Sequence, residues 1–124
     1  MPIVNALIPT GQPREARQAF LKAATQAVVD SVAAPIGSVR VFLQEVAEDN
    51  VLIAGESIGR STLITVALIT GRSDDAKAAL IDAMNNAAIE HLGADGNQVR
   101  VVLYDIPSSD MGMANGKSAK SMGR

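Results

Sequence analysis

The chain has 124 residues, of which 48 % are hydrophobic and 19 % charged, with a formal net charge of −2. This length predicts one domain, or two small halves that share a core. The slightly acidic charge disfavours nucleic acid as a partner, because binding to phosphates needs a basic face. The sequence has no cysteine, which excludes disulfides and thiolate chemistry. Its single histidine, His91, cannot build a histidine cluster.

The hydrophobic residues are spread along the chain rather than gathered in one segment. No segment is long and apolar enough to span a bilayer, and the N-terminus does not have the pattern of a secretory signal. We therefore expect a cytoplasmic protein that does not bind membranes. A small fold keeps a high surface-to-volume ratio and cannot bury this much apolar surface. The composition thus favours a homo-oligomer with apolar interfaces.

The first half of the chain follows a β-α-β pattern. Ile3–Ile8 is short, rich in branched apolar residues and followed by Thr-Gly, which predicts a strand. Pro13–Val32 carries apolar residues at helical spacing, and proline suits the first turn of a helix. "APIGS" ends this helix, and Val39–Val46 is the next predicted strand. The glycine-containing segment Asn50–Ser57 is expected to form a hairpin that covers a neighbouring element.

The second half repeats the first with an offset of sixty residues. "VRVFL" in the first half aligns with "VRVVL" in the second, and a series of alanines coincides in the two helical segments. The duplication predicts a second β-α-β unit. Its strands are expected at Leu63–Ile69 and Val99–Ile106, its helix at Ser73–Leu92 and its hairpin at Met111–Ser118. The apolar face of this helix is predicted to include Ile81.

Two β-α-β units predict a definite architecture. A strand, a crossover helix and a second strand form a right-handed unit with parallel strands. Joined edge to edge, two such units give an α/β (α+β) fold, with a four-stranded sheet and both helices on one face. We expect a first unit at 1–57, a linker at 58–62 and a second unit at 63–124, together one compact domain. The uncovered sheet face again favours oligomerisation.

Pro2 is the first candidate for chemistry. A small residue after the initiator methionine generally permits removal of Met1, which would leave a free prolyl amine. An α-amino group titrates near pH ~8. Burial beside cationic groups lowers its pKa, because both disfavour the ammonium form. The resulting neutral amine could act as a general base. The alternative is that Met-Pro is merely a common start of a chain.

Three arginines are the second candidates. Arg40 and Arg100 occupy matching positions inside the second strand of each unit, and Arg72 follows Gly71 between a strand and a helix. The counterpart of Arg72 in the first unit is Gln12, so the two units have diverged at this position. The forked guanidinium group is suited to carboxylates. The alternative is that these arginines form salt bridges at the surface.

Taken together, several segments resemble the 4-oxalocrotonate tautomerase family. They are the initial Met-Pro, "GRSDDAKAALI", "SVRVFLQE" and "IAGES". The chain is similar to a fused member with two family units in tandem, and fused members are typically trimers. The resemblance implies an isomerase of small 2-hydroxydienoates or enol carboxylic acids that needs no metal or organic cofactor. It also implies a role in aromatic catabolism.

The resemblance assigns roles to individual residues. Pro2 matches the family's amino-terminal proline, which is the general base and acid. Arg40 and Arg100 both match a strand arginine that a neighbouring subunit provides to bind a substrate carboxylate. Arg72 matches the arginine after the first strand, which the partner unit provides. Thr62 takes the position of the proline in the second unit and has no free amine, so one site per chain is expected.

The family places an aromatic residue over the proline as an apolar wall. Val51 matches this position in the first unit, and Met111 or Met113 matches it in the second. An apolar wall is therefore expected without an aromatic ring.

Two other functions stay open. Relatives use the same proline for hydration with dehalogenation or for decarboxylation, which requires a helper such as a carboxylate. Glu45, Glu56 and Asp105 are the candidates for that helper. The third possibility is a non-catalytic trimer that binds small ligands between its subunits.

Overall fold

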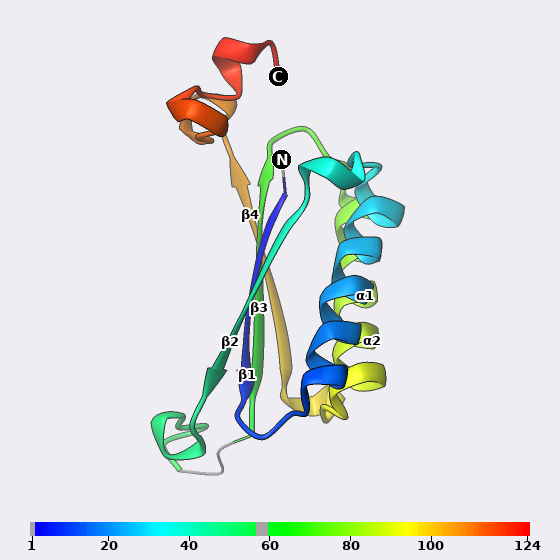
Figure 1. Ribbon diagram of the computed structural model, residues 1–124, viewed down its shortest axis with the longest axis vertical. Coiled ribbons are helices and arrows are strands. Elements are labelled where there is room, and N and C mark those ends of the chain that lie inside the picture. The colour runs from blue at the N-terminus through cyan, green and yellow to red at the C-terminus, as the bar shows by residue number, and fades with distance from the viewer. Residues whose placement is uncertain (1, 57–59) are drawn as a thin grey trace.

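A single mixed sheet with two helices on one face forms the chain (Figure 1). The computed structural model describes residues 2–56 and 60–124. The strands are β1 (Ile3–Pro9), β2 (Arg40–Val46), β3 (Thr62–Ile69) and β4 (Val99–Ile106), and the main helices are α1 (Arg14–Val32) and α2 (Asp74–Leu92). The predicted fold class is confirmed. Each helix begins one residue later than predicted, because Pro13 and Ser73 occupy the N-cap positions.

The strand order β2-β1-β3-β4 places the two units side by side in the sheet. β1 pairs with β2, and β3 with β4, in parallel, whereas β1 and β3 pair antiparallel at the centre. In this central pair Ile3 lies opposite Ala67, and Leu7 lies opposite Leu63. The start of β1 therefore lies beside the end of β3, and the start of β3 lies beside the end of β1. Each end of the sheet thus combines residues from both units.

The core lies between the sheet and the two helices. Alternate residues of the central strands point to the helices, as expected from the period of two in a strand. Val4, Ile8, Ile64 and Leu68 are among those with no exposed surface. Fully buried residues of the helices close this layer: Phe20, Ala24, Val28, Leu80, Met84 and Ala88. These side chains account for most of the hydrophobic stabilisation, at about 1.5–3 kcal/mol for each large one.

One helix residue departs from the predicted apolar face. Ile81 is 41 % exposed, whereas Leu80 and Met84 are fully buried. Successive helix residues are about 100° apart, since a turn contains 3.6 residues. The face of α2 that meets the sheet is centred on Leu80 and Met84, and Ile81 lies beside that face.

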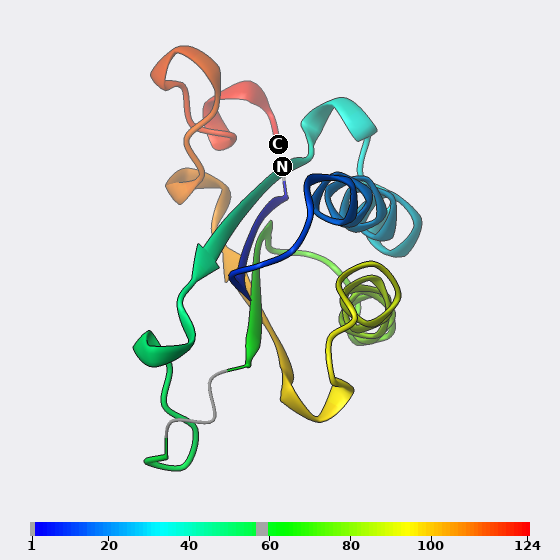
Figure 2. The ribbon, with the colours of Figure 1, turned by 60° about the horizontal axis from the view of Figure 1, so that its bottom comes forward.

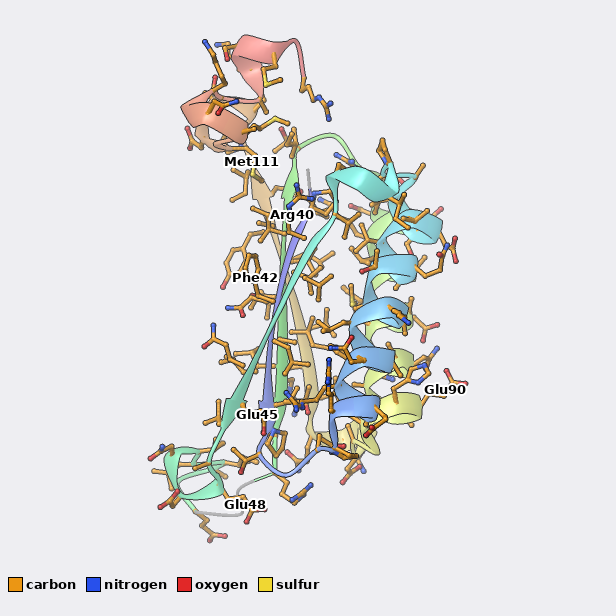
Figure 3. The ribbon with its side chains drawn as sticks, viewed as in Figure 1. Arg40, Phe42, Glu45, Glu48, Glu90 and Met111 are labelled. Carbon is orange, nitrogen blue, oxygen red and sulfur yellow. The ribbon has the colours of Figure 1, made fainter. Side chains whose placement is uncertain are left out.

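The opposite face of the sheet has no covering layer in the described chain (Figure 2). Its exposed apolar side chains include Phe42, Leu63, Val102 and Tyr104. Phe42 points away from the helices in Figure 3. The predicted uncovered sheet face is therefore present.

The segments that follow β2 and β4 extend from opposite ends of the sheet (Figure 1). Each contains one isolated antiparallel bridge, between Ile53 and Glu56 and between Gly112 and Ser118, so the predicted hairpins are present in minimal form. Residues 57–59, which include the end of the first predicted hairpin and part of the predicted linker, lie outside the described residues. Thr62, the last residue of that linker, belongs to β3.

Candidate functional site

Pro2 lies immediately before β1, and its side chain is almost completely buried. Its carbonyl oxygen accepts a hydrogen bond from the backbone nitrogen of Arg40 at 3.1 Å. Extending the β1–β3 register by one residue places Pro2 opposite Leu68, near the end of β3. Met1, whose removal the sequence predicts, lies outside the described residues.

A cavity of about 280 Å³ lies at this end of the sheet. We call it the Pro2 cavity after the end of the sheet at which it lies. Pro2 itself is not among its described lining residues, which include Ser38, just before β2, and Ile69, at the end of β3. Both strands pair with β1 where Pro2 enters it. The described residues that line it are Ala34, Pro35, Ser38, Ile69, Thr70, Arg72 and Arg124.

Two arginines give the Pro2 cavity a positive character. Arg72 is half-buried, and its Nη1 donates a hydrogen bond to the carbonyl oxygen of Ile69 at 3.1 Å. Arg124 lines the same cavity, and its backbone nitrogen donates to the carbonyl oxygen of Ala119 at 2.9 Å. The lining has no acidic side chain. Sequence analysis did not single out Arg124, because only the folding of the segment after β4 brings it back to this end.

The segment after β4 contributes an apolar cluster next to Pro2. Met111 is 4 % exposed and packs with Ile69 and Ala119. Ile3 and Met113 pack against the same cluster. The structure thus places both predicted methionines near the start of β1. Val51 follows β2, and the structure therefore places it at the other end of the sheet.

Arg40 and Arg100 lie on the uncovered sheet face, at opposite ends of the sheet. Each is exposed and folds over the loop before its strand. Arg40 Nη1 donates to the carbonyl oxygen of Gly37 at 3.0 Å, and Arg100 Nη1 donates to that of Asn97 at 2.9 Å. Neither arginine lines the Pro2 cavity of its own chain. Arg40 is at the Pro2 end of the sheet, the end at which Figure 3 also labels Met111.

The candidate carboxylates are engaged elsewhere. Glu45 lies 3.6 Å from the guanidinium of Arg17, and Asp105 accepts from Lys77 Nζ at 2.6 Å. These pairs tie the second strand of each unit to its helix. Glu56 forms the isolated bridge of the first unit. None of the three lines the Pro2 cavity.

A second cavity of about 340 Å³ surrounds Thr62 at the opposite end of the sheet, and we call it the Thr62 cavity. Gln12, the counterpart of Arg72, lies in its wall and donates through Nε2 to the carbonyl oxygen of Leu92 at 2.7 Å. The described residues that line it are Ile8, Pro9, Gln12, Ile53, Arg60, Thr62, Leu92, Gly93, Ala94, Asp95 and Gln98.

The described chain has neither a cluster of metal ligands nor a membrane-spanning helix. Residues 2–56 and 60–124 hold no group of three or more histidine, cysteine or acidic residues placed to bind a metal ion. None of the described helices is long and apolar enough to cross a membrane. His91 lies in the last turn of α2, with its Nε2 3.9 Å from the carboxylate of Glu90.

The fold places this chain in the class of small proteins built from two tandem β-α-β units. Within that fold, a proline precedes β1 and an arginine follows β3. The model of the family described as "Tautomerase enzyme" matches this chain twice, at residues 2–61 and 63–120. The chain therefore belongs to the tautomerase family, and it is an isomerase.

Individual relatives agree with this assignment. The chain is 46 % identical over 52 residues to a probable tautomerase of Ralstonia nicotianae, RSp0893. The matched segment covers 42 % of this chain and 74 % of that protein. It is 40 % identical over 57 residues to the 2-hydroxymuconate tautomerase of Comamonas testosteroni, covering 46 % of this chain and 89 % of that protein. Each of these proteins thus matches less than half of this chain.

Solved structures match nearly the whole chain. A structure described as "Q0 fused 4-OT wild type symmetric trimer" superposes with a TM-score of 0.95 at 50 % identity, over 98 % of this chain and 99 % of that chain. The crystal structure of Pt0534 inactivated by 2-oxo-3-pentynoate gives 0.94 at 38 % identity, with the same coverage. The predicted similarity to fused tautomerases is therefore confirmed.

Proposed function

We propose that the chain interconverts enol and keto forms of small 2-hydroxydienoate or enol carboxylic acids, with Pro2 as general base and acid. The observation that carries this proposal is the shared position of two groups from different units: Pro2 enters β1 at the end of the sheet where Arg72 lines a cavity. The name of the Comamonas testosteroni relative supports 2-hydroxymuconate as a substrate of this class.

The proposed reaction moves one proton and requires no cofactor. Removal of Met1 frees the secondary amine of Pro2, and the neutral amine takes a proton from the hydroxyl group of the dienol. The electrons left on oxygen form the ketone, and the double bonds shift along the chain of the substrate. Protonated Pro2 then returns the proton to a carbon of the substrate. Arg72 binds a carboxylate and stabilises the negative charge that develops during the transfer.

We also propose that the working form is a homotrimer, in the cytoplasm, with the uncovered sheet faces in contact. The exposed apolar residues of that face and the trimer named for the fused 4-OT Q0 support this assembly. In a trimer with threefold symmetry, the same end of the sheet of every chain lies at the same end of the assembly. Arg40 is at the Pro2 end and Arg100 at the other, so a neighbouring chain presents Arg40 to the Pro2 end. Arg40 is then the strand arginine that serves this site, with Met111 and Met113 as its apolar wall.

The test uses the purified chain with its intact mass measured first. Chain that has lost Met1 is expected to ketonise 2-hydroxymuconate or phenylenolpyruvate, followed by absorbance, in proportion to the fraction of processed chain. Pro2→Ala is expected to lower kcat at least about 100-fold, the usual contribution of a general base. Pro13→Ala, at the exposed N-cap of α1, is the matched control.

Two results would overturn the proposal. One is processed chain with no rate above that of buffer, which would favour a non-catalytic trimer that binds ligands. The other is equal activity of the Pro2→Ala variant and the unaltered chain. Faster turnover of 3-haloacrylates or malonate semialdehyde than of enols would instead assign hydration with dehalogenation or decarboxylation.

A further inference from the structure

The Thr62 cavity has no part in the function proposed for Pro2, yet it is the larger of the two cavities described. Its volume of about 340 Å³ lies within the range of about 300–1,000 Å³ that is typical of small-molecule sites. Its walls come from the end of β1, the start of β3, the end of α2 and the loop before β4. Ile53 and Arg60, from the segment between β2 and β3, complete the described lining, so both units contribute to the cavity.

Polar groups enter this cavity from fixed positions. Thr62, with an exposed fraction of 3 %, contributes a hydroxyl group that can both donate and accept. The hydrogen bond from Gln12 Nε2 to Leu92 holds the Gln12 amide in place, and the oxygen of that amide is an acceptor. The Asp95 carboxylate is held by the backbone nitrogen of Asn97 at 3.0 Å.

The charges differ from those of the Pro2 cavity at matching positions. Gln12 stands where the Pro2 cavity has Arg72, and Asp95 stands where it has Pro35. Arg60 is the basic residue of the lining, and its Nη1 lies 2.9 Å from the carboxylate of Glu48, which offsets its charge. A carboxylate ligand would meet the negative charge of Asp95 with no unpaired cation among the described lining residues.

We propose that the Thr62 cavity is a second small-molecule site that binds uncharged ligands with hydroxyl or amide groups and rejects carboxylates. Amide and hydroxyl protons of the ligand are donated to Asp95 and to the amide oxygen of Gln12. The ligand oxygen accepts from Thr62. The apolar residues Ile53 and Leu92 contact its carbon atoms. The two ends of one chain thus select ligands of different charge.

Lactamide and lactate form a matched pair of probes, because they differ chiefly by the carboxylate. In a titration followed by ¹H–¹⁵N NMR, lactamide is expected to give saturable shifts of the Gly93 and Ala94 amides. Lactate is expected to shift Thr70, in the Pro2 cavity, and not Gly93. Thr62→Val keeps the shape of the side chain, and its loss of one hydrogen bond should weaken lactamide binding about five-fold.

Gln12→Arg is the second variant, and it supplies the cation that the other end already has. It is expected to add lactate-induced shifts at Gly93 and to weaken the preference for lactamide. The proposal is overturned if lactamide gives no saturable shift at Gly93 or Ala94, or if lactate shifts Gly93 equally in the unaltered chain. Because these signals come from the end away from Pro2, the outcome is independent of the tautomerase assay.

Discussion

Replacement of Arg72 by glutamine gives the Pro2 cavity the side chain that Gln12 already supplies at the other end. Arg72 is half-buried in the wall of the cavity, with its Nη1 3.1 Å from the carbonyl oxygen of Ile69. Glutamine retains a donor for that carbonyl and removes the positive charge. The substitution therefore tests charge rather than local folding.

The expected loss follows from the strength of a charge-assisted hydrogen bond. Such a bond to a carboxylate contributes about 1.5–3 kcal/mol, and each 1.4 kcal/mol is a factor of about ten in affinity. The KM of Arg72→Gln for 2-hydroxymuconate should therefore rise about 10- to 150-fold. The carboxylate is present in both the substrate and the transition state, so most of the effect should fall on KM rather than on kcat.

The measurement is steady-state ketonisation by absorbance, on chain whose mass shows the loss of Met1. Arg14→Gln is the matched control, since Arg14 is an exposed arginine at the start of α1 that lines neither cavity. An unchanged KM in Arg72→Gln would refute the assigned role. So would an equal rise in the Arg14→Gln control.

Three further substitutions test the structure that supports the site. Met111→Ala should lower the free energy of unfolding by about 2 kcal/mol in urea denaturation, because the Met111 side chain is only 4 % exposed. The control Met122→Ala, at a side chain that is 51 % exposed, should change the free energy of unfolding little. Equal effects of the two substitutions would contradict the packing described. Ser73→Ala should cost about 1 kcal/mol, since the Ser73 hydroxyl accepts from Ala76 N at 3.1 Å, and Ser73→Asp should restore the cap. Phe42→Asp should dissociate the oligomer in light scattering, whereas Phe42→Leu should not; an intact Phe42→Asp assembly would exclude this face as the interface.

Most of the fold could be predicted from the sequence because both units carry regular patterns. Alternation in β1 and β3 identifies the residues that point to the helices, and the duplication repeats the same signal. The prediction that Ile81 belongs to the buried face of α2 is wrong, because an apolar residue beside that face also fits the helical spacing of apolar residues. The glycine-containing segments after β2 and β4 form the predicted hairpins as single antiparallel bridges, and the place of the second depends on tertiary contacts such as that of Met111 with Ile69.

Local sequence patterns predicted less of the candidate site than of the fold. Pro2 and Arg72 are far apart in the sequence, and the pattern of two β-α-β units does not specify how the units pair. The resemblance of the chain to a known family, rather than hydrophobic periodicity, predicted that Pro2 and Arg72 belong to one site. The antiparallel β1–β3 register is what brings them to one end. Arg124 has no periodic or motif signal, since its place depends on the segment after β4.

The same register explains how a duplicated chain can have two different ends. Pro2 of the first unit lies at the same end of the sheet as Arg72 of the second, and Thr62 of the second unit lines one cavity with Gln12 of the first. A substitution in one unit therefore changes the cavity around the first strand of the other. Gln12 does not affect the charge of the Pro2 cavity, because Arg72 lines that cavity. The two ends can therefore differ together in a cation and in the first residue of the strand: Gln12 and Thr62 lie at one end, and Arg72 and Pro2 at the other.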